Sequence, residues 1–208
     1  MMRRVATALL VVALTAGCAS AAGDHTDHAG HLSSGGFAGT AIQNPYPLPD
    51  QPFTDTAGQQ FTPAADADRP VTLVFFGYTH CPDVCNVVLA NIASALRRVD
   101  PPVRDKVEMV FITTDPDRDT AKVVRGYLDR FDPAYVGLTA PITTVRAAAA
   151  SLHIAYAGKE SAAGGGYDVS HGTQVTAFRD GTARVVWTAE TPVQDLRSDL
   201  VRLAALPS

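Results

Sequence analysis

The chain has 208 residues, of which 46% are hydrophobic and 18% are charged. This length allows one domain of ordinary size plus an extension, and the hydrophobic content excludes disorder throughout the chain. With 17 basic against 21 acidic residues and a net charge of −4, the chain lacks the basic surplus that binds phosphates, so we expect no nucleic-acid partner.

The first 17 residues have the features of a secretory signal peptide. A positive head, Met1 to Arg4, precedes an apolar run at 5–16 that is too short to span a bilayer as a helix. The run ends in Leu14-Thr15-Ala16-Gly17-Cys18, which resembles the cleavage box of bacterial lipoproteins. We therefore expect a lipid at Cys18 that anchors the protein to the extracytoplasmic face of the bacterial cytoplasmic membrane. A plain secreted protein and an uncleaved anchor are the alternatives.

Residues 18–49 are rich in Ala, Gly, Ser, Thr and Pro and lack periodic hydrophobic residues, so they are predicted to form a flexible tether. Three of the six histidines of the chain fall within it, at His25, His28 and His31. Neutral imidazoles at this spacing can collect a metal ion once the chain is ordered. The alternative is a solvated linker whose histidines have no such role.

The regular part of the chain begins at residue 52. Apolar ends flank a polar turn at 53–61, which predicts a small hairpin. The continuous apolar run at 71–76 predicts a central strand that is buried on both faces. A loop with Cys81 and Cys85 follows, and then apolar residues spaced three and four apart predict a helix at 84–99.

The second half continues to alternate strands with helices. We predict a buried strand at 107–112 and helices at 120–131 and 141–152. A brief strand at 154–156 and a flexible Gly and Ala stretch at 158–166 come next. Two strands then flank Asp180-Gly181, a strong hairpin turn, and a closing helix runs over 192–203.

Residues 50–208 are therefore predicted to form one α/β domain, a thioredoxin-like sandwich. It has a central sheet, crossover helices and a C-terminal hairpin that is followed by a helix. A flavodoxin-like sheet is the main competitor. It gives no reason for a cysteine pair directly after the first central strand.

The motif Cys81-Pro82-Asp83-Val84-Cys85 lies where that strand hands over to a helix. Unsatisfied backbone N–H groups and the helix dipole favour thiolates at such a position. A thiolate is both a better ligand for a soft metal and a better nucleophile for disulfide exchange, so both chemistries stay open. A purely structural disulfide is less favoured, because a loop of three residues restricts little chain entropy.

The string from Gly77 to Cys85, Gly-Tyr-Thr-His-Cys-Pro-Asp-Val-Cys, resembles the signature of the Sco (SenC-type) family. Its members are membrane-tethered, thioredoxin-fold copper-delivery proteins that help to assemble the dinuclear copper centre of cytochrome c oxidase. Two further segments are similar to the family: Asp115-Pro116-Asp117-Arg118-Asp119-Thr120, and Tyr167-Asp168-Val169-Ser170-His171, where its metal-binding histidine stands. The resemblance covers the globular part of the chain.

The resemblance implies that Cys81, Cys85 and His171 bind copper. Two thiolates and one imidazole suit Cu(I), and Cu(II) can add a further ligand. The implied partner is the copper-bearing subunit of apo cytochrome c oxidase, with another copper chaperone or a thiol reductant as a further partner. The glycines at 164–166 would let the loop of His171 move toward the cysteines when metal arrives.

The chain departs from the family at two positions. Asn86 stands where Pro is common, and Ser170 stands where an Asp usually precedes the histidine. Ser170 has no charge to orient the imidazole, but Asp168 could compensate, and Asp83 is a second candidate for a supporting role beside the ligands.

Two functions from different classes follow. The first is a metallochaperone without catalytic turnover. The second is a thiol-disulfide oxidoreductase, in which Cys81 or Cys85 attacks a partner's disulfide and the other cysteine resolves the intermediate. A peroxidase on the same fold is a weaker third candidate, because the hydroxyl and arginine surroundings of a peroxidatic cysteine are not recognisable.

Overall fold

A computed structural model of the chain describes residues 35–82, 84–161 and 166–207. The predicted signal peptide (residues 1–17), Cys18 and the histidines at positions 25, 28 and 31 lie outside the described residues, as does Asp83. Within the described ranges, the strands are β1 (Thr40–Ala41), β2 (Phe53–Asp55), β3 (Gln60–Phe61), β4 (Val71–Gly77), β5 (Val107–Thr113), β6 (Val136–Thr139), β7 (Tyr156–Ser161), β8 (Tyr167–His171), β9 (Val175–Arg179) and β10 (Thr182–Trp187). The helices are α1 (Pro63–Asp66), α2 (Val84–Arg98), α3 (Pro101–Arg104), α4 (Ala121–Leu128), α5 (Ile142–Ser151) and α6 (Val193–Ala205).

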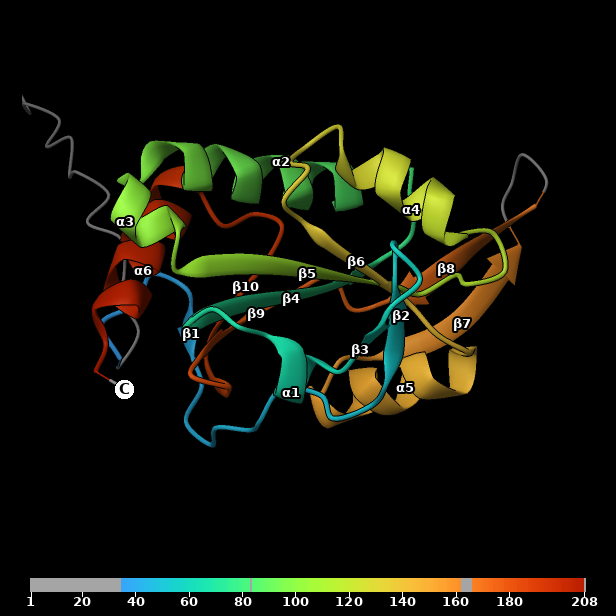
Figure 1. Ribbon diagram of the computed structural model, residues 1–208, viewed down its shortest axis with the longest axis horizontal. Coiled ribbons are helices and arrows are strands. Elements are labelled where there is room, and N and C mark those ends of the chain that lie inside the picture. Colours follow the sequence, from blue (N-terminus) through green and yellow to red (C-terminus); the bar gives the residue numbers. More distant parts are fainter. Residues whose placement is uncertain (1–34, 83, 162–165, 208) are drawn as a thin grey trace, which may run out of the picture.

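A mixed sheet in the order β1-β10-β9-β4-β5-β6-β2-β3 forms the centre of the molecule (Figure 1). β4 and β5 run parallel, with Val71 opposite Val107 and Gly77 opposite Thr113, and all their residues are buried. β9 pairs with the other side of β4 in the antiparallel direction. This arrangement confirms the predicted thioredoxin-like α/β sandwich, with the strand at 71–76 at its centre.

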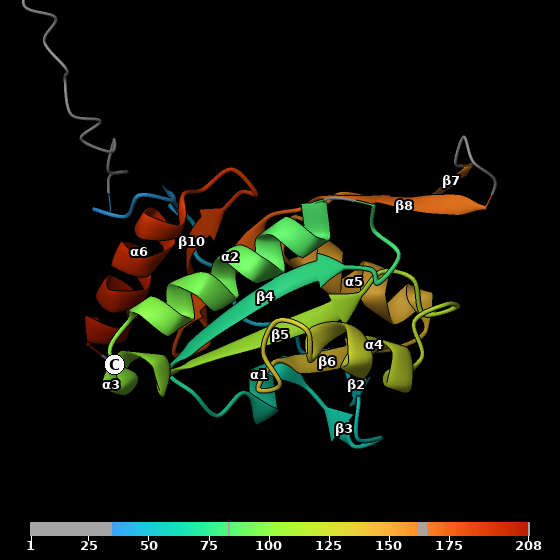
Figure 2. The same ribbon diagram turned by 90° about the horizontal axis from the view of Figure 1, so that it is seen from above.

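Helices cover both faces of this sheet (Figures 1 and 2). Side chains of β4 alternate between the two faces, as a strand requires. Leu73 and Phe75 belong to the core that also contains residues of α2, α4 and α6, whereas Val74 and Phe76 belong to the core under α5. None of the helices in the described ranges is both long enough and apolar enough to cross a membrane.

Residues 35–49 pack against the domain, although their composition predicted a tether. β1 pairs with β10, with Thr40 opposite Val186, and the side chains of Phe37 and Leu48 are buried. The prediction was wrong for this stretch because isolated apolar residues show no periodicity in sequence. Phe37 and Leu48 each pack into a core formed by segments that are distant in the sequence.

The segment that ends at His171 forms a separate two-stranded hairpin of β7 and β8. Tyr156 lies opposite His171, and the register shifts between Tyr156 and Gly158. The sequence predicted a flexible stretch from residue 158, which was wrong for residues 158–161. Gly158 has a φ of 103°, which fits an irregularity inside a strand rather than the end of one.

Candidate metal centre

The two cysteines lie at the junction of β4 and α2. Cys81 is 7% exposed, and Cys85 is fully buried in the first turn of α2. The backbone N–H of Cys85 donates a hydrogen bond to the Cys81 sulfur, with 3.4 Å between N and Sγ. Because the N-terminus of a helix favours negative charge, this position stabilises thiolates. It suits a soft metal ion and also suits thiol exchange.

Gly77, the last residue of β4, allows the second cysteine to approach the strand. A Cβ atom at this position would lie 3.2 Å from Cys85 Sγ and 2.8 Å from Phe111 Cε2. A larger residue would therefore displace Cys85 or Phe111, since a packed core accommodates added atoms poorly. The first residue of the signature string thus has a packing role beside the site.

His171 ends β8, and its imidazole packs edge-on against the ring of Tyr78, with 5.9 Å between the ring centroids. Its Nδ1 lies 2.8 Å from the carbonyl oxygen of Gly172. Because a carbonyl only accepts, Nδ1 carries the proton and Nε2 keeps a lone pair that can bind a metal. Burial lowers the pKa of His171, against the raising effect of the Gly172 carbonyl, so the imidazole is uncharged at neutral pH.

The three predicted ligands do not converge in this structure. Among residues 35–82, 84–161 and 166–207, no three His, Cys, Asp or Glu side chains lie close enough together to hold a metal ion. The two cysteines are neighbours, whereas His171 contacts the ring of Tyr78, three residues before Cys81. A site with all three ligands therefore requires His171 and the sulfurs to come closer together.

Asp168, predicted to support His171, contacts the cysteine loop through the same tyrosine. The hydroxyl of Tyr78 donates to Asp168 Oδ1, with 3.3 Å between the oxygens. Burial is the main cause that raises the pKa of Tyr78 to about 12, so the hydroxyl keeps its proton. Tyr78 therefore contacts Asp168 and His171 of β8.

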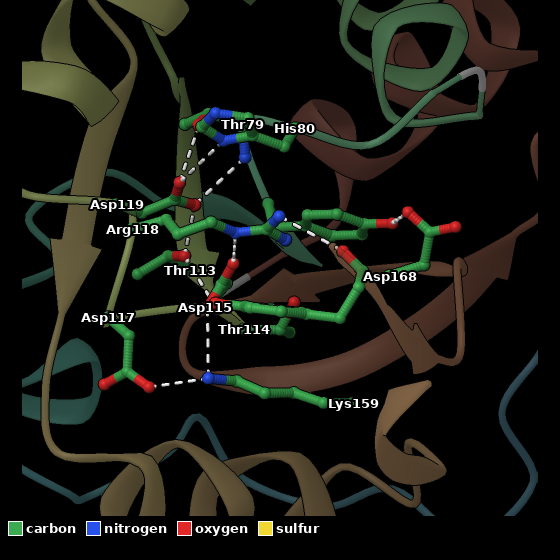
Figure 3. Close-up of polar contacts among 12 residues, drawn as sticks. Thr79, His80, Thr113, Thr114, Asp115, Asp117, Arg118, Asp119, Lys159 and Asp168 are labelled. Carbon is green, nitrogen blue, oxygen red and sulfur yellow. Dashed lines mark hydrogen bonds and ion pairs between the residues drawn. The ribbon is translucent and has the colours of Figure 1, made fainter. Parts of the chain in front are cut away.

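Asp119 joins the cysteine loop to the segment after β5 (Figure 3). Its carboxylate is fully buried and accepts hydrogen bonds from the Thr79 N–H at 2.9 Å and the Thr79 hydroxyl at 2.6 Å. The Thr113 hydroxyl donates a third bond at 2.6 Å. The imidazole of His80 also lies near it, with 3.9 Å between Nδ1 and Oδ1. Asp119 thus holds the backbone two residues before Cys81.

Asp119 does not cap the helix that follows. The N-cap of α4 is Thr120, whose hydroxyl accepts a hydrogen bond from the Val123 N–H at 3.4 Å. Both Asp and Thr are good N-cap residues, so the local sequence does not choose between two neighbours. Because the carboxylate of Asp119 binds Thr79, Thr120 is the residue that caps α4.

The same segment also holds the β7–β8 hairpin (Figure 3). The buried carboxylate of Asp115 pairs with Arg118 and accepts a hydrogen bond from the Tyr167 hydroxyl at 2.9 Å. Lys159 of β7 pairs with Asp117, with 2.6 Å between Nζ and Oδ2. The sequence singled out residues 115–120 as a motif but not as a link between elements. In the structure they connect the cysteine loop with the hairpin that carries His171.

Tyr127 of α4 is a further group near the cysteines that the sequence did not identify. Its hydroxyl is buried and, among the described residues, has no hydrogen-bond partner. Burial raises the pKa of Tyr127, and the negative charges of Cys85 and Cys81 raise it further. The sequence placed this residue only within the helix predicted at 120–131, and the tertiary structure relates it to the sulfurs.

Comparisons with known proteins agree with this geometry. The sequence model of the SCO1/SenC family matches residues 41–205. The mitochondrial protein SCO1 homolog 1 of Arabidopsis thaliana is 36% identical over 85 residues, which cover 41% of this chain and 25% of that protein. The matched regions span about a quarter to a third of the length of this and the next curated relatives.

Two solved structures are similar over most of the described residues. Apo Sco1 from Thermus thermophilus is 30% identical and has a TM-score of 0.71, and the match covers 80% of this chain and 96% of that chain. Copper-bound ScoI from Bradyrhizobium japonicum is 31% identical, with a TM-score of 0.63 and coverage of 78% and 99%.

Proposed function

Because the chain belongs to the SCO1/SenC family, we propose that it is a metallochaperone that carries copper and releases it to a partner. Copper, as Cu(I) or Cu(II), is the cargo, and Cys81, Cys85 and His171 bind it. The recipient is the copper-bearing subunit of apo cytochrome c oxidase, where the ion enters the CuA centre. Another copper chaperone supplies the metal, or a thiol reductant reduces the two sulfurs.

The observation that carries this proposal is the state of His171. Its Nδ1 donates to the Gly172 carbonyl, and this leaves Nε2 as a metal-binding atom next to the cysteine loop. The two sulfurs at the N-terminus of α2 supply the soft donors that Cu(I) prefers. An imidazole added to them gives the mixed donor set that Cu(II) also accepts, so the site can hold both oxidation states.

The place of the protein is part of the proposal. A lipid on Cys18 would hold it at the extracytoplasmic face of the bacterial cytoplasmic membrane, with part of the predicted tether between lipid and domain. Substitution Cys18→Ser should shift the protein from the membrane fraction to the soluble fraction. Retention of the variant in the membrane fraction would refute the lipid anchor but not the copper site.

The first prediction concerns the third ligand. We expect His171→Ala to lower the affinity for Cu(II) by more than about 100-fold. Loss of a residue that only hydrogen-bonds to a metal ligand already lowers metal affinity by about 10- to 100-fold. Exchange of the Cys81–Cys85 pair with a disulfide substrate should stay within about threefold of wild type, because exchange needs only the sulfurs. Separate titrations of the reduced protein with Cu(I) and Cu(II), and an exchange assay, measure these quantities.

His80→Ala is the matched control, because His80 adjoins Cys81 but its side chain is 55% exposed and lies against Asp119. This variant should bind Cu(II) like wild type. If His80→Ala abolished Cu(II) binding while His171→Ala did not, the assignment of the third ligand would be wrong.

The second candidate function is thiol-disulfide exchange, in which the protein reduces the copper-ligating cysteines of the oxidase or other extracytoplasmic partners. The hydrogen bond from the Cys85 N–H to the Cys81 sulfur favours this candidate, because it stabilises a thiolate at Cys81. Failure of exchange in His171→Ala together with intact copper binding would reverse the ranking of the two functions.

A further inference from the structure

The β7–β8 hairpin, which ends in the proposed ligand His171, forms a sheet of its own. Figure 2 shows it extending along the end of the domain where β4 and α2 meet. In the described residues, no strand of the main sheet pairs with it. Side-chain contacts and the burial of Val169 must therefore fix its position.

Most of these contacts reach one segment, residues 114–118. The hydroxyl of Tyr156 donates to the Thr114 carbonyl oxygen at 3.4 Å, and that of Tyr167 donates to Asp115 at 2.9 Å. The ion pair of Lys159 with Asp117 lies at the surface, with both side chains more than 40% exposed, so it adds little to stability.

Arg118 links this segment to the hairpin and to the cysteine loop (Figure 3). Its Nε donates to the buried Asp115, and its Nη1 donates to the Tyr167 carbonyl oxygen at 3.1 Å. Its guanidinium carbon lies 3.8 Å from the centre of the Tyr167 ring and 5.8 Å from that of the Tyr78 ring. Arg118 therefore touches an aromatic residue of the hairpin and an aromatic residue of the cysteine loop at the same time.

Both aromatic residues are connected with His171. Tyr78 contacts the imidazole, and Tyr167 is four residues before His171 on the same strand. A planar guanidinium that stacks on a ring and pairs with a buried carboxylate has one preferred orientation. Such a group restricts how far β8 can move away from the cysteine loop.

We propose that Arg118 is a positioning residue that holds β8 beside Tyr78, so that His171 is within reach of copper bound at Cys81 and Cys85. This inference rests on the proposed function and names a further part of the same site. Without Arg118, the hairpin would have to lose more conformational freedom when the imidazole binds, and the affinity would fall. Cu(II), which needs the imidazole, should be affected more than Cu(I), which the two thiolates can hold.

The test compares Arg118→Met and Arg118→Lys with Arg125→Met. Arg125 of α4 is a control that makes an ion pair and a carbonyl contact of the same kind elsewhere. Its Nε pairs with Asp129 at 2.8 Å and its Nη1 donates to the Tyr135 carbonyl oxygen at 2.7 Å. Titrations with Cu(I) and Cu(II), pulsed electron paramagnetic resonance of the imidazole nitrogen, and thermal unfolding are measured for each variant.

We expect Arg118→Met to lower the Cu(II) affinity by about tenfold or more and to weaken the imidazole nitrogen signal, with Cu(I) affinity changed by less than about threefold. Arg118→Lys keeps the charge but loses the planar stack, so it should fall between wild type and Arg118→Met. Arg125→Met should bind both ions like wild type.

Equal loss of Cu(I) and Cu(II) affinity in Arg118→Met, or affinities like those of wild type, would overturn the inference. If Arg118→Met fails to fold, Tyr167→Leu, which removes the stacking ring and leaves the Arg118–Asp115 pair, replaces it with the same expected result. A failure of the inference alone is recognisable, because His171→Ala would still abolish Cu(II) binding. If His171→Ala had no effect, the proposed function itself would fail.

Discussion

Asp119 shows how a single buried residue organises the neighbourhood of the cysteines. Its carboxylate accepts bonds from Thr79 and Thr113, which come from the cysteine loop and from β5. A charged acceptor with three short hydrogen bonds offsets the cost of its own burial. These hydrogen bonds hold the loop before Cys81 next to the segment that follows β5.

The second prediction concerns the replacement of this carboxylate. We expect Asp119→Asn to lower the free energy of unfolding by roughly 2 to 4 kcal/mol, because an amide group turns a donor toward groups that also donate. Urea denaturation measures the change. Asp129→Asn is the control, since Asp129 is 49% exposed and pairs with Arg125 at the surface; its effect should be below about 1 kcal/mol. If both substitutions lowered the free energy of unfolding equally, the buried hydrogen bonds of Asp119 would stabilise the fold no more than a surface ion pair does.

At the scale of secondary-structure elements, the two central strands carry a polar pair inside a buried ladder. Thr72 of β4 lies opposite Glu108 of β5, and its hydroxyl donates to Glu108 Oε1 at 3.2 Å. The backbone N–H of Arg69 donates to the same oxygen at 3.3 Å. Burial raises the pKa of Glu108, and these two hydrogen bonds oppose the shift without cancelling it.

The raised pKa gives a pH-dependent prediction. The folded state favours protonated Glu108, so its contribution to stability is fully present below the ordinary value of 4.5 and is lost as the pH rises through the folded-state pKa. Glu108→Gln removes this loss, so the stability of the variant relative to wild type should increase between pH 4 and pH 7. Unfolding free energies at both pH values test this.

The control for this measurement is Glu190→Gln, at an exposed position. Its stability relative to wild type should be nearly the same at pH 4 and pH 7. A Glu108→Gln variant that lost stability relative to wild type over the same range would contradict the sign of the shift.

At the scale of the whole molecule, the chain enters the domain at the end away from the cysteine loop. β1 and α6 lie at one end of the molecule, whereas the junction of β4 with α2 and the β7–β8 hairpin lie at the other (Figures 1 and 2). Asp199 of α6 holds the entering segment, since it accepts bonds from the Ala38 and Gly39 N–H groups at 2.8 and 2.9 Å.

We therefore expect Asp199→Ala to release the segment at 35–41 and to lower the free energy of unfolding by roughly 2 to 4 kcal/mol. The variant also deprives the buried Trp187 Nε1, which donates to Asp199 at 2.8 Å, of its acceptor, so tryptophan fluorescence should change. Denaturation, limited proteolysis and fluorescence measure these effects. Asp195→Ala on the same helix is the control and should cost less than about 1 kcal/mol. Equal protease resistance of the two variants would contradict the role of Asp199.

Elements with a local pattern could be predicted from the amino-acid sequence alone. The apolar runs of β4 and β5, the helical spacing of α2, and the Asp180-Gly181 turn of the β9–β10 hairpin were predicted close to their observed positions. They were predictable because each depends on the periodicity or turn chemistry of a few neighbouring residues. The position of the cysteine pair followed from the same local pattern, since it lies between a recognisable strand and a recognisable helix.

Elements that depend on distant partners could not be predicted in this way. β6, which contains Gly137, and the strands β1, β7 and β8 have weak patterns of their own, and they form because other segments offer a ladder or a core to them. The contacts around the site have the same origin: Thr79 binds Asp119 across 40 residues, and Arg118 binds Tyr167 across 49. Apolar residues spaced two positions apart, or three to four, predict a strand or a helix. This spacing carries no information about contacts between residues so far apart in the sequence. Their partners are chosen when the whole chain packs into one core.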